Sequence, residues 1–127
     1  LETTKAANEQ VNIKVEPQKE NISYEEFSKM DIRIGTILEA ERVPKTQKLM
    51  KLLIDTGIDK RTVVSGIAEH FTPEEVINKQ VAILVNLEPR KIKGIESHGM
   101  ILMAENADGK LRFILPGESV ENGSTVK

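Results

Sequence analysis

Three cations, Arg90, Lys91 and Lys93, fall within four residues of this chain. Glu88 and Glu96 lie on either side of them, but no acidic residue between these cations offsets the charge. Clustered cations contact phosphates, and such contacts supply most of the non-specific affinity of proteins for nucleic acids. A solvated surface is the commoner explanation for any single lysine, but this short spacing is less ordinary. The stretch therefore indicates a binding site for a polyanion.

Six further cations surround the first two predicted turns: Arg42, Lys45, Lys48, Lys51, Lys60 and Arg61. The whole chain of 127 residues carries a formal net charge of −2, which by itself would argue against a nucleic-acid partner. The charges are not spread evenly, because residues 32–104 contain eleven basic and nine acidic residues. A polyanion responds to the local field rather than to the total charge, so the middle of the chain is the candidate surface.

Aromatic residues are scarce, which limits the kind of nucleic acid that this surface could bind. They make up 3% of the chain: Tyr24, Phe27, Phe71 and Phe113. Single strands are usually held by bases that stack on aromatic rings placed among cations. Tyr24 and Phe27 fall in a predicted helix and Phe113 in a predicted strand, so a stacking platform is not supported. We expect contacts with the backbone of folded RNA, which a protein recognises by its shape.

The neighbouring Ser97 and His98 raise the question of nucleophilic catalysis. Adjacent residues of a strand point to opposite faces, so these two side chains are badly placed to share a proton. No strand–turn–helix elbow surrounds the serine. The other histidine, His70, is distant in sequence, and the chain has no cysteine to supply a thiolate metal ligand. The sequence therefore predicts no catalytic residue, no metal site and no cofactor.

Short strands separated by turn signals must position these residues. Hydrophobic alternation and β-branched runs predict five or six strands, at 31–43, 49–55, 61–65, 80–87, 99–104 and 111–115. Gly35 within the first of them marks a bend or a bulge. A capping box at Ser23 predicts a helix over residues 24–30. Thr72, followed by a proline, begins a second short helix between the third and fourth strands.

Three strands, a helix and two further strands in this order predict an all-β protein, an OB-fold five-stranded Greek-key barrel. A six-stranded sandwich is the alternative. Residues 90–93 then lie on a polar connection between two buried strands, facing solvent. Residues 1–21 have no sustained periodicity and are predicted to be a linker or disordered tail, with residues 22–127 as the folded domain. The alternation of Val11, Ile13 and Val15 leaves a short edge strand as an option.

The sequence contains no signal for export or for insertion into a membrane. No apolar run approaches the roughly 20 residues of a membrane-spanning helix, and no secretory signal opens the chain. The absence of cysteine fits a reducing compartment, so we expect a cytoplasmic protein. The chain begins with Leu1 rather than with methionine, which suggests a fragment of a longer polypeptide.

Six short motifs occur in the order and rough spacing of one known family: Asp31-Ile32-Arg33-Ile34-Gly35, Lys48-Leu49, Ile54-Asp55-Thr56-Gly57, Val64-Ser65-Gly66-Ile67, Asn86-Leu87-Glu88-Pro89 and Ser97-His98-Gly99-Met100. They resemble the tRNA-binding domain appended to the C-terminus of many bacterial methionyl-tRNA synthetases. The same domain occurs as free-standing tRNA-binding proteins and in eukaryotic synthetase cofactors. The likeness extends from about Ile22 to the end of the chain, and several ordered motifs together are more specific than any one.

The resemblance implies an OB-fold that recognises tRNA by shape, near the outer elbow of the L and independently of the anticodon. It also implies a homodimer, with the N-terminal helix and a C-terminal dimerisation extension at the two-fold interface, and a covalently linked synthetase catalytic body. Ser97 and Met100 match the family's S-x-G-M motif, and Asn86 matches its N-L-x-P turn. Arg33 and Lys48 match positions on the barrel face and in the first turn.

Eight residues are predicted to bind tRNA: Arg33, Lys48, Asn86, Arg90, Lys91, Lys93, Ser97 and Met100. The cations would contact phosphates, the serine and the asparagine would hydrogen-bond the backbone or a 2′-hydroxyl, and the methionine would form an apolar floor. The chain departs from the family pattern at two places. Glu88 stands where a cation is usual, and residues 44–47 differ from the usual first turn.

These expectations combine into one functional hypothesis and one main rival. The hypothesis is a non-catalytic module that raises the affinity of a methionyl-tRNA synthetase for tRNA, because linkage makes the second contact intramolecular. The rival is a dimeric peptide-binding secretion chaperone, which one bacterial branch of the same family resembles. An enzyme ranks third, because the sequence offers no site for the chemistry.

Overall fold

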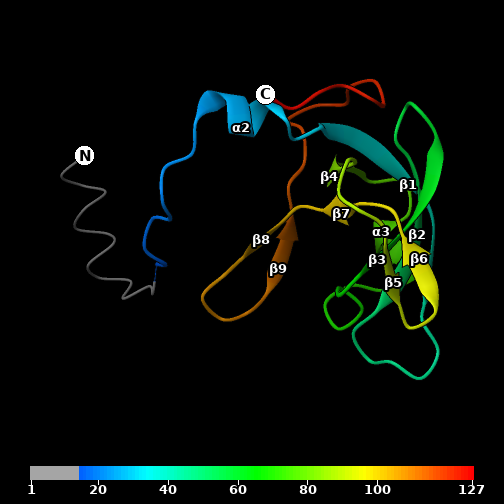
Figure 1. Cartoon of the computed structure of the whole chain (residues 1–127). Coiled ribbons are helices and arrows are strands. Elements are labelled where there is room, and N and C mark those ends of the chain that lie inside the picture. The colour runs from blue at the N-terminus through cyan, green and yellow to red at the C-terminus, as the bar shows by residue number, and fades with distance from the viewer. Residues whose placement is uncertain (1–14) are drawn as a thin grey trace.

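The computed structural model describes residues 15–127 (Figure 1). These residues form the short helices α2 (Tyr24–Ser28) and α3 (Pro73–Val76). Their strands are β1 (Ile32–Arg42), β2 (Met50–Asp55), β3 (Lys60–Ser65), β4 (Gln80–Leu84), β5 (Arg90–Ile92), β6 (Ile95–Ser97), β7 (Met100–Ile101), β8 (Met103–Glu105) and β9 (Leu111–Phe113). Val11 and Ile13 of the optional edge strand lie outside the described residues, and residues 15–23 contain no helix or strand.

An almost closed five-stranded antiparallel barrel forms the centre of the molecule. Its strand order is β3-β2-β1-β4-β7, and α3 lies between β3 and β4 in the chain. The long β1 pairs with both β2 and β4, using its second half for β2 and its first half for β4. The backbone amide of His98 donates to the Thr62 carbonyl oxygen at 2.9 Å, which brings the chain before β7 onto β3. The predicted all-β OB-fold is confirmed.

The barrel interior is filled by the alternate residues of its strands. Met50, Leu52 and Ile54 of β2 are fully buried, whereas the residues between them are half-buried. Ile37 of β1 and Ile83 of β4 meet them in the same core. Each such aliphatic side chain contributes about 1.5–3 kcal/mol when it leaves water. This packing makes the barrel a firm support for the hairpin that crosses its outside.

Gly35 is required for a close approach of two strands, and the bulge, one of the two roles predicted for it, is not at this glycine. A Cβ atom at this position would lie 2.8 Å from the Asp55 carbonyl oxygen, which is too short for any side chain. The pairing of β1 with β2 shifts register between Ile37 and Glu39, so Leu38 is the extra residue of the bulge. The bulge therefore lies three residues beyond the glycine.

The basic stretch forms a hairpin, where the sequence predicted an irregular connection. β5 and β6 pair antiparallel, and Lys93 and Gly94 form the two-residue turn between them. Both turn residues have positive φ, 52° and 81°, as a type I′ turn requires. The predicted strand at 99–104 is also divided, because β7 pairs with β4 whereas β8 pairs with β9. The strand predicted at 80–87 ends at Leu84.

The capping box predicted at Ser23 and the helix start predicted at Thr72 are confirmed, although the first helix is shorter than predicted. The Ser23 hydroxyl accepts from the Glu26 amide at 3.1 Å, and the Glu26 carboxylate accepts from the Ser23 amide at 3.2 Å. The helix ends at Ser28, two residues before the predicted end at Met30. Thr72 caps α3 in the same reciprocal manner.

The C-terminal segment continues the sheet where β2 ends. The Ile34 amide donates to the Ser124 carbonyl oxygen at 2.9 Å, and the Val126 amide donates to the Ile32 carbonyl oxygen at 2.8 Å. These bonds satisfy the part of the β1 edge that β2 does not reach. The segment thus returns to the beginning of β1, beside α2 (Figure 1). Within residues 15–127 no helix has both the length and the hydropathy to cross a bilayer.

Candidate nucleic-acid interface

The β5–β6 hairpin separates its cations onto two faces. Arg90 pairs with Ser97, Lys91 with Glu96, and Ile92 with Ile95. Directly opposed residues share a face of the ladder. Ile92, Ile95 and Ser97 are partly or fully buried, so their face lies toward the barrel and also carries Arg90. Lys91 lies on the opposite face, where it is exposed.

Ser97 anchors this hairpin to the barrel. Its side chain is buried, with 4% of the residue exposed. The hydroxyl accepts from the Val64 amide at 2.9 Å and donates to the Gly99 carbonyl oxygen at 3.4 Å. A buried hydroxyl needs such partners, and here they tie β6 to β3. The structure therefore places this predicted RNA ligand beneath the hairpin, with its hydroxyl engaged inside the protein.

Arg90, Ser97 and Met100 line one small hollow of about 50 Å³ beside the hairpin. Met100 is 45% exposed, although it belongs to a barrel strand. Gly99, just before it, has φ 133°, and a Cβ atom there would lie 2.9 Å from the Leu84 carbonyl oxygen. This close approach lets the chain turn so that Met100 reaches the surface. Three of the predicted residues are thus brought together.

The tip of the hairpin and Lys48 lie at the same end of the barrel. Ser97 bonds Val64 and His98 bonds Thr62, so β6 runs antiparallel to β3. The tip at residues 93–94 consequently projects past the end of β3 at Ser65. Ser65 pairs with Met50, the first residue of β2, and the connection from β1 to β2 therefore leaves the barrel at this end.

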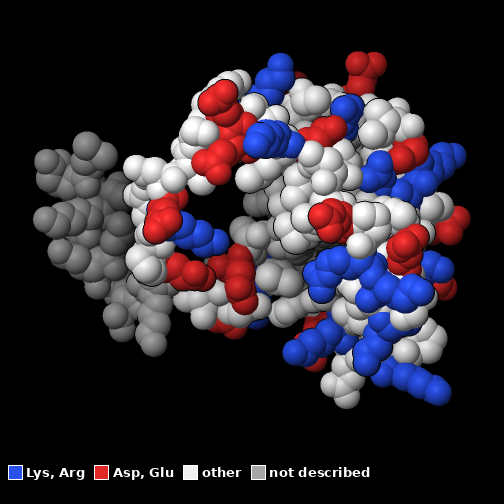
Figure 2. Space-filling view, viewed as in Figure 1, with Lys and Arg blue, Asp and Glu red and all other residues white. Residues whose placement is uncertain are grey.

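Lys48 and the cations of the hairpin are exposed at this end of the barrel. Within residues 15–127, no carboxylate pairs with Lys48 or with a cation of the hairpin. Figure 2 shows Lys and Arg side chains gathered where Figure 1 places β5 and β6, whereas Asp and Glu are prominent around the segment that leads to α2. The uneven distribution of charge along the sequence therefore also appears in the structure, with basic residues at the hairpin and acidic residues near the segment that leads to α2.

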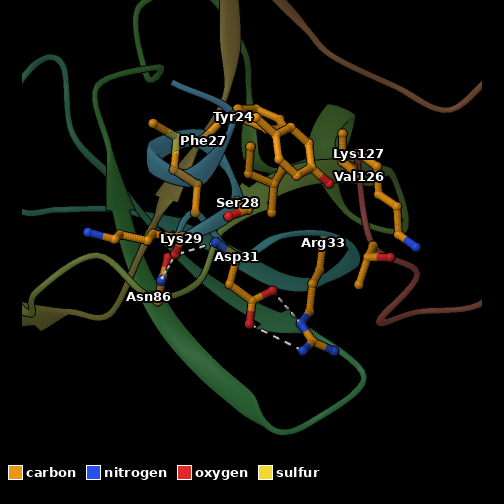
Figure 3. A pocket seen from close by; sticks show the side chains of 12 residues that line it. Tyr24, Phe27, Ser28, Lys29, Asp31, Arg33, Asn86, Val126 and Lys127 are labelled. Atoms are coloured by element: carbon orange, nitrogen blue, oxygen red, sulfur yellow. Dashed lines mark hydrogen bonds and ion pairs between the residues drawn. The ribbon is translucent and has the colours of Figure 1, made fainter. Parts of the chain in front are cut away.

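Arg33 and Asn86 lie elsewhere, around a groove of about 610 Å³ between α2 and the C-terminal segment (Figure 3). The Arg33 guanidinium bonds both carboxylate oxygens of Asp31, at 2.8 and 3.2 Å, which raises the pKa of Arg33. The Asn86 amide accepts from the Asp31 backbone at 2.9 Å and donates to the Lys29 carbonyl oxygen at 2.6 Å. Asn86 therefore holds the end of α2 against β4.

The groove is lined by polar and apolar residues, and several of the apolar side chains are open to solvent. Tyr24 and Met30 are 81% and 45% exposed, and Val126 from the C-terminal segment is 39% exposed. Figure 3 shows Tyr24 and Phe27 on α2, with Val126 and Lys127 on the other wall. Apolar side chains grouped in this way on a surface are typical of an interaction site. The predicted set of eight residues is therefore divided between this groove and the hairpin end.

Arg61 has a structural role that the sequence reasoning missed when it counted this residue among the surface cations. Its guanidinium donates to the Val85 carbonyl oxygen at 2.7 Å and to the His98 carbonyl oxygen at 3.2 Å. It also bonds both carboxylate oxygens of Asp59, at 3.0 and 2.8 Å. The bond from Arg61 holds the pKa of Asp59 below its usual range. The i, i+2 spacing of the two residues, which in an extended chain brings side chains to the same side, was the available signal.

Comparison with known proteins shows which family this chain resembles. The family model described as "Putative tRNA binding domain" matches residues 32–125. The methionine–tRNA ligase of Flavobacterium johnsoniae is 61% identical over 126 residues, which cover 99% of this chain and 18% of that protein. The enzyme of the same name from Porphyromonas gingivalis is 55% identical over 127 residues, which cover 100% of this chain and 19% of that protein.

Two solved structures are also similar to this chain. The "MetRS related protein" of Pyrococcus horikoshii has a TM-score of 0.81 and 40% identity, covering 86% of this chain and 100% of that chain. The chaperone CsaA of Bacillus anthracis has a TM-score of 0.77 and 27% identity, covering 85% of this chain and 100% of that chain. The chain spans less than a fifth of the ligases that it matches. It belongs to the family of tRNA-binding domains whose model covers its barrel.

Proposed function

We propose that this chain is a non-catalytic tRNA-binding module of a methionyl-tRNA synthetase. The observation that carries the proposal is a group of cations at one end of the barrel that no carboxylate of residues 15–127 pairs, three of them on a hairpin fixed by Ser97. Lys48, Arg90, Lys91 and Lys93 contact phosphates in this proposal, and Met100 provides the apolar floor. Contacts of this kind read the shape of folded RNA and need no stacking platform.

Ser97 and Asn86, in this proposal, serve tRNA binding indirectly, because each one holds an element of the structure in place. Ser97 keeps the hairpin on β3, and Asn86 keeps α2 on β4. Arg33, which Asp31 neutralises, belongs to the groove rather than to the RNA surface. Fewer than the eight predicted residues therefore contact RNA in this proposal.

The module works by linkage to a catalytic body. The family and the ligase relatives support this attachment. A tethered second site makes the second contact intramolecular, and the resulting effective concentration raises overall affinity for tRNA without new contacts in the body. This role places the chain in the cytoplasm, the compartment expected from its sequence.

A homodimer is part of the same proposal. The exposed apolar residues of α2 and of the C-terminal segment form a groove that a second copy would cover. A two-fold axis at this groove would let the same patch on each copy face its counterpart. The exposed Tyr24 is the natural centre of such an interface.

Binding of total tRNA by the 127-residue chain, measured at increasing salt, tests the RNA proposal. Affinity should fall steeply with salt, because each phosphate contact releases a counterion. Replacing Lys91 and Lys93 by glutamine should weaken binding to all tRNAs about equally and reduce the salt slope by about two. The matched control is Lys110→Gln in the β8–β9 turn. Affinity that is insensitive to salt, or a loss confined to one tRNA, would contradict binding by shape.

The similarity to the chaperone CsaA supports a second candidate, the binding of unfolded polypeptide. The exposed cations of the hairpin favour RNA, because an unfolded segment presents no regular array of negative charge. A competition experiment separates the two functions. Permanently unfolded, carboxymethylated polypeptide should not displace labelled tRNA from the chain, and displacement at stoichiometric amounts would favour the chaperone.

A further inference from the structure

The S-H-G-M segment, residues 97–100, has hollows on both sides. The first is the small hollow lined by Ser97 and Met100. The second, about 410 Å³, lies beside His98, and its other lining residues come from β3 and the residue before it: Asp59, Lys60, Arg61 and Thr62. Neighbouring residues of an extended chain point to opposite sides, which explains why one segment serves both hollows.

The second hollow is lined by side chains that carry hydrogen-bond donors. Lys60 is exposed and has no ion pair with any carboxylate of residues 15–127. Thr62, which is half-buried, adds a hydroxyl to the same lining. The His98 side chain is 40% exposed, and its Nε2 contacts the Glu96 carboxylate at 3.0 Å. Only in the protonated ring, where both nitrogens carry a hydrogen, can Nδ1 donate to an anion while Nε2 donates to Glu96.

The acidic wall of this hollow does not repel an anion strongly. Asp59 is the acidic lining residue, and Arg61 occupies both of its carboxylate oxygens. This pair is close to neutral as a unit, and the Glu96 carboxylate beside the hollow is engaged by the His98 ring. Lys60 is therefore the lining cation that no carboxylate of residues 15–127 pairs. A small anion with several acceptor oxygens fits a lysine, a hydroxyl and an imidazole better than a cation or an apolar group does.

We propose that this hollow is a second subsite for a backbone phosphate of the same RNA, held between Lys60 and His98. The inference rests on the proposed function and extends its contact surface. β3 carries the hairpin tip at its Ser65 end and Lys60 at its other end, about 17 Å away at the usual rise of a strand. The RNA backbone thus follows β3 from the basic end of the barrel toward its beginning.

Substitutions that change the charge of the hollow test the subsite in the 127-residue chain. With transcribed tRNA as the probe, Lys60→Gln should reduce the slope of log affinity against log salt by about one and weaken binding about threefold to tenfold. Lys60→Arg should keep the wild-type affinity. His98→Arg should bind more tightly than His98→Glu. Lys110→Gln in the β8–β9 turn is the matched loss of one exposed lysine and should change nothing.

The outcomes distinguish the subsite from the proposed function. If Lys60→Gln and His98→Glu bind like the wild type while the Lys91 and Lys93 double variant loses binding, the subsite is refuted and the hairpin function stands. If the hairpin double variant also binds normally, the proposed function itself fails. Thermal unfolding of each variant, with midpoints matching the wild type, assigns a loss of affinity to the surface rather than to the fold.

Discussion

At the scale of single residues, the same side-chain types have two different uses in this molecule. Arg33 and Arg61 each bond the aspartate two positions earlier, which immediately precedes the strand, so each charge is neutralised within the fold. Arg90 and Lys91 have no such partner within residues 15–127. Counting cations along the sequence cannot separate these uses, whereas the position of the nearest carboxylate can.

The Asp59–Arg61 pair predicts how stability should depend on pH. The pKa of Asp59 lies below its usual range because Arg61 hydrogen-bonds its charged form. In the unfolded chain an aspartate titrates near its ordinary value, about 3.9. The pair therefore stabilises the fold above about pH 4, and this contribution disappears as the pH falls through the folded pKa.

Asp59→Asn should accordingly be less stable than the wild type at pH 7, and the difference should narrow between about pH 5 and pH 3. Urea unfolding at several pH values measures the free energy of unfolding of both proteins and the difference between them. Glu118→Gln, a change at an exposed acid, is the control and should run parallel to the wild type. A constant difference between Asp59→Asn and the wild type across this range would refute the linkage.

At the scale of elements, the barrel could be predicted because its strands alternate clearly, as β2 does with Met50, Leu52 and Ile54. The β5–β6 hairpin could not, because each of its strands has three residues and β5 is mostly charged. The structural roles of Ser97 and Asn86 could not be predicted from the sequence either, because their hydrogen-bond partners lie 33 and 57 residues away along the chain. Both residues were found by motif, and the structure adds the intramolecular hydrogen bonds that each one makes.

Two substitutions in the turn of the hairpin separate the effect of its conformation on tRNA binding from the effect of its charge. Lys93 has φ 52°, a region that asparagine tolerates better than lysine. Lys93→Asn should therefore keep or slightly raise the thermal midpoint while it weakens tRNA binding, because the turn is retained and one cation is lost. Gly94→Val should weaken binding with every cation still present, because a β-branched residue is strained at φ 81°. Equal affinity of Gly94→Val and the wild type would show that the hairpin need not be ordered.

At the scale of the whole molecule, β1 connects the two surfaces that the proposals use. The groove lies beside its first residues, where Ile32 and Arg33 line it. The connection that carries Lys48 follows its last residue, Arg42. A dimer formed at the groove would therefore leave both basic ends uncovered, and one assembly could present two RNA-binding surfaces.

Tyr24→Glu tests this arrangement, because a charge at an exposed and largely apolar position should prevent burial against a second copy. Light scattering should report a dimer for the wild type and a monomer for the variant. Ile58→Glu, which changes an exposed apolar residue in the β2–β3 turn, is the control and should remain dimeric. The Tyr24 variant should keep its intrinsic affinity for a single tRNA, since the hairpin end is distant from the groove along β1. A wild-type chain that stays monomeric at high concentration would remove the dimer and leave the hairpin proposal intact.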